Sequence, residues 1–163
     1  MKQLWAPWRM AYVEEGPKED GCIFCTKFQT HNPRSGLVLA HTPHTVVMLN
    51  KYPYSSAHLL IAPKRHESNL ARLPAEDFAD LNETLRRSVE IIQDIFRPGG
   101  VNLGMNLGKC AGAGIDDHLH WHIVPRWEGD TNFMPVLAET RVIPQHLLDT
   151  YDRLQPLFQN LSA

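Results

Sequence analysis

The chain lacks the features that mark a membrane protein, a disulfide-rich secreted protein or a nucleic-acid-binding protein. No apolar run reaches the roughly 18 residues of a membrane span, and the N-terminus has no signal-peptide pattern. With 3 cysteines in 163 residues, a secreted disulfide framework is excluded. The formal net charge of -2 offers no basic surface for nucleic acid or an anionic membrane. We therefore expect a cytoplasmic protein that has neither nucleic acid nor a membrane as a partner.

The hydrophobic pattern indicates an α+β fold. Short runs rich in β-branched residues, bounded by Pro, Asn and Ser, predict strands. Apolar residues at three- and four-residue steps predict a long helix over 78–95 and a second helix that opens at Pro144. Strands in hairpin-like order together with two helices are typical of an antiparallel sheet. The expected strands cover residues 37–40, 45–49, 58–62, 101–106 and 118–125.

The two ends of the chain differ from its middle. Residues 1–35 are poor in periodicity and rich in turn-forming residues, so we expect an irregular N-terminal segment that binds zinc through its cysteine pair. Residues 128–163 form a C-terminal extension that contains the second helix. A length of 163 residues suits one domain that spans 1–163.

Three histidines alternate with apolar residues at 118–122. Alternate side chains of a strand share one face, so His118, His120 and His122 would line about 13 Å of a sheet at about 3.3 Å per residue. Leu119 and Trp121 would face the core. One such histidine is readily explained as a buried structural residue, but three would each need a partner. The trio therefore predicts a site, either catalytic or metal-binding.

A glycine-rich loop over residues 108–114 precedes the histidines. Such loops let backbone N–H groups approach an anion closely, although a merely flexible loop has the same composition. Beside the histidines, the loop predicts a phosphate cradle. A neutral imidazole can attack a phosphorus atom, and a second acceptor can then cleave the phospho-histidine bond. Cys110, inside the loop, is interpreted as a small neutral spacer.

Cys22 and Cys25 form a C-x-x-C pair, which supplies half of a tetrahedral zinc site. The chain has no second cysteine pair, so histidines would have to complete the site. Two buried thiols or a redox pair are the alternatives, but the βαβ pattern expected around a redox motif is missing. The remaining histidines are expected at the surface: His31, His41, His44 and His146.

The motif H-L-H-W-H-I-V at 118–124 and the stretch at 50–66 resemble the histidine-triad (HIT) family of hydrolases and transferases. The resemblance covers residues 20–127. The opening at 4–9 and the tail after Trp127 resemble the branch that acts on dinucleoside polyphosphates. The resemblance to the family implies a HIT-like fold, which consists of an antiparallel sheet with one long helix and a C-terminal helix. It also implies a homodimer in which Trp127 and the C-terminal segment border the partner's site.

The resemblance also implies a role for individual residues. His120 would be the nucleophile that takes the α-phosphate, His122 would hydrogen-bond a phosphate oxygen, and His58 would support the triad. The predicted nucleotide-binding residues are Asn50 (at the ribose), Asn106, Gly112, Gly114 and His122.

For the metal, the resemblance implies that His66 and His118 complete the site begun by the cysteines. The result would be a closed, structural zinc site. The predicted ligands are Cys22, Cys25, His66 and His118.

The chain departs from the family pattern in two places. Ile115 stands where the family's hydrolases often carry a polar residue, so any phosphate contact there would come from the backbone. Asp116 and Asp117 bring negative charge near a polyanion and must point away or be engaged by a histidine.

The predicted activity is cleavage of the phosphoanhydride bond of dinucleoside polyphosphates through a nucleotidyl-His120 intermediate. Whether water or inorganic phosphate is the acceptor, and so whether the enzyme is a hydrolase or a phosphorylase, stays open. A purine nucleoside phosphoramidase is a further alternative. Other classes are a non-catalytic nucleotide-binding regulator and a zinc hydrolase whose triad holds the metal. A zinc-ribbon interaction module is disfavoured because a second ligand pair is lacking.

Overall fold

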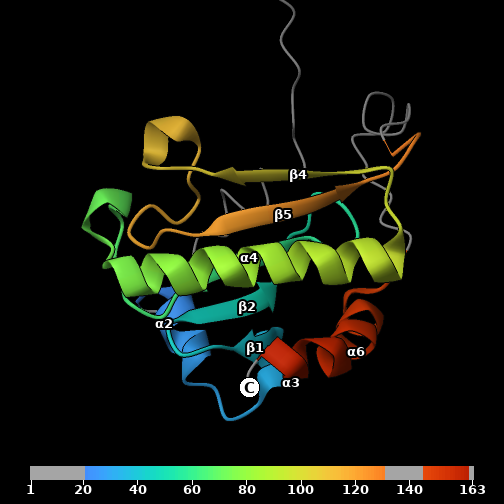
Figure 1. Ribbon diagram of the computed structural model, residues 1–163, viewed down its shortest axis with the longest axis horizontal. Coiled ribbons are helices and arrows are strands. Elements are labelled where there is room, and N and C mark those ends of the chain that lie inside the picture. Colours follow the sequence, from blue (N-terminus) through green and yellow to red (C-terminus); the bar gives the residue numbers. More distant parts are fainter. Residues whose placement is uncertain (1–20, 131–144, 162–163) are drawn as a thin grey trace, which may run out of the picture.

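An antiparallel five-stranded sheet, in the order β1-β2-β3-β5-β4, organises the molecule (Figure 1). The computed structural model describes residues 21–130 and 145–161. Every neighbouring pair of strands is antiparallel, which confirms the predicted fold class. The strands are β1 (Val38–His41), β2 (Thr45–Leu49), β3 (Leu59–Pro63), β4 (Gly100–Met105) and β5 (Trp121–Arg126).

One long helix, α4 (Ala75–Phe96), lies across one face of the sheet (Figure 1). Leu81 and Ile92 from its apolar stripe are fully buried against the sheet. Phe78, predicted in the same stripe, is 42% exposed and stays outside the core. The helix ends at Phe96, and the C-cap residue Arg97 adopts a left-handed conformation just before Pro98.

The C-terminal helix α6 (Leu147–Phe158) packs beside β1. The hydroxyl of Tyr151 donates a hydrogen bond of 2.9 Å to the carbonyl of Val38. Pro144, where this helix was predicted to open, lies outside the described residues, as do residues 4–9. No helix in the two described ranges is both long enough and apolar enough to cross a membrane.

The prediction of an irregular N-terminal segment is wrong for residues 21–35. Two short helices occupy it, α2 (Ile23–Phe28) and α3 (Pro33–Gly36). The Asn32 side chain caps α3 by accepting from the Ser35 N–H, and Pro33 stands at the first helical position. Helices this short have too few turns to show an apolar period, so a periodicity search misses them.

The prediction that the last strand starts at His118 is also wrong, because β5 begins at Trp121. The neighbouring strand cannot extend the ladder further: Pro63 has no N–H to donate, and its carbonyl accepts from the His118 ring. The Leu119 N–H donates instead to the carbonyl of Glu67. Residues 118–120 therefore lie outside the sheet.

The two faces of the sheet bury different side chains. Leu119 and Ile123 join the large core under α4. On the opposite face Met48 and Leu60 form a smaller core with Phe24 of α2. His122 is the direct partner of Leu60, and direct partners in an antiparallel pair share a face. The histidines therefore lie on the face opposite α4, as the alternation predicts.

Candidate active site and metal centre

His120 is held in one tautomer by the backbone. Its Nδ1 lies 2.9 Å from the carbonyl oxygen of His118, and a carbonyl can only accept, so Nδ1 carries the proton. In the neutral ring, Nε2 then keeps its lone pair. Only 5% of His120 is exposed, and this burial lowers the pKa of the imidazole. At neutral pH His120 is therefore an uncharged ring with a nucleophilic Nε2.

A second pair of histidines is oriented by a backbone N–H. The Tyr54 N–H donates to Nδ1 of His58 at 3.1 Å, so the neutral His58 ring carries its proton on Nε2. That Nε2 lies 2.9 Å from Nδ1 of His122, which must accept. His122 therefore presents an N–H at Nε2. This is the group required to donate a hydrogen bond to a phosphate oxygen.

The contact of Tyr54 with the histidine rings was not predicted from the sequence. The centroid of the Tyr54 ring lies 4.7 Å from that of His58, in a tilted contact, and 6.0 Å from that of His122, on which it stacks. His58 itself is fully buried. The His120 and His122 rings meet at 4.9 Å in a T-shaped arrangement, so the predicted nucleophile and the predicted donor are adjacent.

Asn50 and His58 face each other across the turn between β2 and β3. The Asn50 amide nitrogen Nδ2 lies 3.3 Å from Nδ1 of His58, and its Oδ1 accepts from the Tyr52 N–H at 2.9 Å. Nδ2 has two hydrogens, so one is left over for a ligand. The geometry thus brings Asn50 to the histidines, and its predicted contact with a ribose stays a prediction.

The glycine-rich loop lies between β4 and the histidine segment. Asn106 donates from Nδ2 to the carbonyl of Gly112 at 3.3 Å and so ties the loop to the end of β4. Gly112 has a φ of 85°, a conformation that favours glycine. Gly114 lies two residues further along the same loop. Their contacts with a nucleotide remain predictions.

Of the two acidic residues after the loop, Asp117 lies near a histidine as expected, whereas Asp116 is engaged by a lysine instead. Asp116 lies 3.7 Å from the ammonium of Lys109, and Asp117 lies 4.0 Å from Nε2 of His66. Ile115 packs against the small core around Phe24, so it turns an apolar side chain away from solvent.

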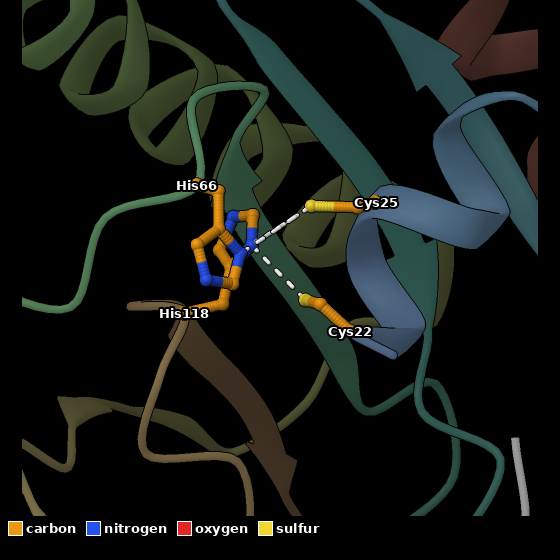
Figure 2. Close-up of side chains that lie close together, drawn as sticks. All are labelled: Cys22, Cys25, His66 and His118. Atoms are coloured by element: carbon orange, nitrogen blue, oxygen red, sulfur yellow. Dashed lines mark hydrogen bonds between the residues drawn. The ribbon is translucent and has the colours of Figure 1, made fainter. Parts of the chain in front are cut away.

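The four predicted metal ligands converge (Figure 2). Their ligand atoms all lie within 4.8 Å of one another. Nδ1 of His118 is 3.3 Å from Sγ of Cys22 and 3.7 Å from Sγ of Cys25, and Nδ1 of His66 is 3.4 Å from Sγ of Cys25. Ordinary zinc bond lengths in a tetrahedron separate N and S by about 3.6 Å. These three N–S distances are therefore compatible with a tetrahedral zinc site.

The protonation states also suit a cation. His118 donates from Nε2 to the carbonyl of Pro63 at 2.8 Å, so its Nδ1 lone pair faces the sulfurs. Burial, with the neighbouring Cys22 sulfur, raises the pKa of the Cys25 thiol to about 11. The Cys25 sulfur therefore needs a cation to offset its charge before it can ionise at neutral pH.

His44 does not fit its predicted place as a simple surface residue. It is half-buried, and its Nδ1 lies 2.9 Å from Oδ1 of Asp77 in the first turn of α4. Arg65, next to the candidate ligand His66, holds the other oxygen of Asp77 at 2.7 Å. This contact anchors the loop after β3. Of the other three histidines, His31 and His146 are exposed and His41 is half-buried.

Comparisons with known proteins agree with this geometry. The profile of the family described as "HIT domain" matches residues 33–129. An "AP-4-A phosphorylase" from Mycobacterium tuberculosis is 39% identical over 157 residues, which cover 92% of this chain and 80% of that protein. The chain therefore belongs to the HIT family.

Solved structures share the fold. A histidine triad nucleotide-binding protein from Sulfolobus tokodaii superposes with a TM-score of 0.65 at 27% identity, covering 86% of this chain and 91% of that one. A Zn-bound histidine triad family protein from Mycobacterium smegmatis gives a TM-score of 0.64 at 22% identity, covering 85% and 93%. Both support the HIT-like α+β fold predicted from the motif.

The hydrogen bonds predict one tautomer for each ring, which long-range ¹H–¹⁵N NMR measures directly. At neutral pH we expect the proton of His120 on Nδ1 and those of His58 and His122 on Nε2. The exposed His31 serves as the control and should average over both forms. A proton on Nε2 of His120 would contradict the assignment of that atom as the nucleophile.

Proposed function

We propose that this protein is an enzyme that cleaves dinucleoside polyphosphates at an α-phosphorus through a nucleotidyl intermediate on His120. The observation that carries the proposal is the paired tautomers: a free lone pair on Nε2 of His120 beside an N–H on Nε2 of His122. The relative named AP-4-A phosphorylase supports this substrate class.

The reaction needs two displacements at phosphorus. Nε2 of His120 attacks the α-phosphorus, a P–N bond forms, and the P–O bond to the leaving polyphosphate breaks. His122 donates its Nε2 hydrogen to a phosphate oxygen and offsets the charge that develops there. An oxygen of the second acceptor then attacks the same phosphorus, and the P–N bond breaks to release His120. Diadenosine tetraphosphate would give ATP in the first step.

Inorganic phosphate is the acceptor that the comparison favours, because the 39% identical relative carries the name of a phosphorylase. Attack by phosphate on adenylyl-His120 yields ADP, whereas attack by water yields AMP. The same site supports either acceptor. The nucleotide contacts of Asn50, Asn106, Gly112 and Gly114 belong to this proposal.

The test is a product assay on diadenosine tetraphosphate with and without inorganic phosphate. A phosphorylase gives ADP and ATP only when phosphate is present, and an asymmetric hydrolase gives AMP and ATP without it. His120→Ala should lower turnover by roughly a thousand-fold or more, as loss of a nucleophile does. The exposed His146→Ala is the control and should leave turnover unchanged. Full activity of His120→Ala would overturn the mechanism, and no cleavage by the wild type would favour the nucleotide-binding regulator.

We also propose that Cys22, Cys25, His66 and His118 hold a zinc ion. Four ligands of this kind close the coordination sphere, so the ion would supply a cross-link between α2 and the histidine segment rather than an open coordination position. The carboxylate of Asp117 near Nε2 of His66 is a suitable outer partner for that ring. A zinc site of this kind requires both cysteines as thiolates, and this requirement agrees with the predicted cytoplasmic location. That location stays a prediction.

Metal analysis tests the zinc assignment. We expect one zinc per chain in the wild type and loss of that zinc in Cys22→Ser. The matched control is Cys110→Ser, since Cys110 is exposed and outside the cluster. His122→Ala should keep the full zinc content. Loss of zinc in His122→Ala would instead favour the reading in which the triad itself binds the metal.

The predicted homodimer has a candidate surface in β4. Within the described residues this strand pairs on one side only, with β5, so its other edge is free. Leu103, in the middle of the strand, is 48% exposed. We propose that a second copy covers this edge, because antiparallel self-pairing about a two-fold axis would satisfy both free edges at once.

Light scattering of two matched variants tests the interface. Leu103→Glu should convert a wild-type dimer into a monomer, because the charge would be buried between two copies. Phe78→Glu replaces an equally exposed apolar residue on α4 and should remain dimeric. A monomeric wild type, or a dimeric Leu103→Glu, would contradict the proposed interface.

A further inference from the structure

The side chain of Phe24 links the metal cluster to the nucleophile. Phe24 lies on α2 between Cys22 and Cys25, and it is the one residue of that helix that is fully buried. Its ring lies between the sheet and residues 118–122. On the side of the sheet, it belongs to the small core that contains Met48 and Leu60. No catalytic role of Phe24 follows from the sequence alone, since one aromatic residue in a short segment carries no pattern.

Phe24 packs against both His118, a candidate metal ligand, and His120, the candidate nucleophile. Its ring centroid is 4.9 Å from that of His120, at an interplanar angle of 43°. It is 5.0 Å from that of His118, at 47°. The hydrogen bond to the His118 carbonyl holds His120 at Nδ1, on one edge of the ring. The tilted contact with Phe24 and the T-shaped contact with His122 then restrain the tilt of the His120 ring.

The position of Phe24 depends on a helix that has little stability of its own. α2 contains 6 residues, and its N-cap residue Cys22 makes no capping hydrogen bond through its side chain. Isolated helices of this length do not persist in water. The helix is therefore held by the burial of Phe24 and by the contacts of Cys22 and Cys25 with His66 and His118.

We propose that Phe24 is a positioning residue for His120, and that the Cys22–Cys25 cluster contributes to catalysis by holding Phe24 against that ring. The inference rests on the proposed function, because it concerns the nucleophile of that reaction. Phe24 touches no substrate in this account. It acts by keeping the lone pair of His120 Nε2 aimed at the phosphorus, beside the donor His122.

The experiment compares Phe24→Leu with Phe28→Leu. Phe28 lies on the same helix and meets the His118 ring edge-on at 5.6 Å, but among the described residues it makes no ring contact with His120. Three quantities are measured in each variant: zinc per chain, KM for diadenosine tetraphosphate, and the single-turnover rate at which nucleotidyl-His120 forms. Long-range ¹H–¹⁵N NMR reports the tautomer of the His120 ring without substrate.

Phe24→Leu should retain one zinc per chain and a KM within about two-fold of the wild type. Adduct formation should slow roughly ten- to a hundred-fold, as expected when a reacting group loses its alignment. Its His120 ring, no longer restrained, should give nitrogen shifts that move toward the average of the two tautomers. Phe28→Leu should match the wild type in all these measurements.

Several outcomes overturn the proposal. Adduct formation at the wild-type rate in Phe24→Leu, with a single His120 tautomer, would show that the contact is only structural. If Phe24→Leu loses zinc or unfolds, Phe24→Met, which fills the space without a ring, replaces it. Zinc loss in both Phe24→Leu and Phe24→Met would show that Phe24 supports only the metal cluster. If the wild type forms no adduct, the proposed function fails, and the NMR comparison still tests whether Phe24 orients His120.

Discussion

The burial of Leu119 and Ile123 is the constraint on which the site depends. Both side chains lie in the large core under α4, and both are almost completely shielded from water. Because neighbouring side chains of an extended chain point to opposite faces, their burial turns His120 and His122 to the other face of the sheet. The core thus orients the histidines, because a shift of the strand register by one residue would turn the histidines into the core and the apolar side chains out of it.

Backbone groups then convert this placement into a defined protonation state. One carbonyl holds the proton of His120 on Nδ1, and one N–H, from Tyr54, directs the proton of His58 toward His122. Backbone donors and acceptors cannot exchange roles, so neither tautomer depends on the choice made by another titratable side chain. The result places the proposed nucleophile, His120, beside the proposed donor, His122.

Much of the fold and the candidate site could be predicted from the sequence, because alternation and helical periodicity are local signals. These two patterns predicted the long helix, most of the strands and the shared face of the histidines. The family resemblance implied the four metal ligands that the structure brings together. What was missed depends on tertiary contacts. The early end of the ladder at Pro63, the stacking of Tyr54 on His122 and the packing of Phe24 each require a partner distant in sequence. The short helix α2 carries no period to detect.

The central claim is that His120, and no other histidine, bonds covalently to phosphorus during turnover. Rapid quenching of the enzyme with diadenosine tetraphosphate in the absence of inorganic phosphate, followed by peptide mass spectrometry, measures this directly. The account predicts one adenylyl group per chain, located on His120. An adduct on His122 or His58, or turnover with no adduct at any time, would contradict it.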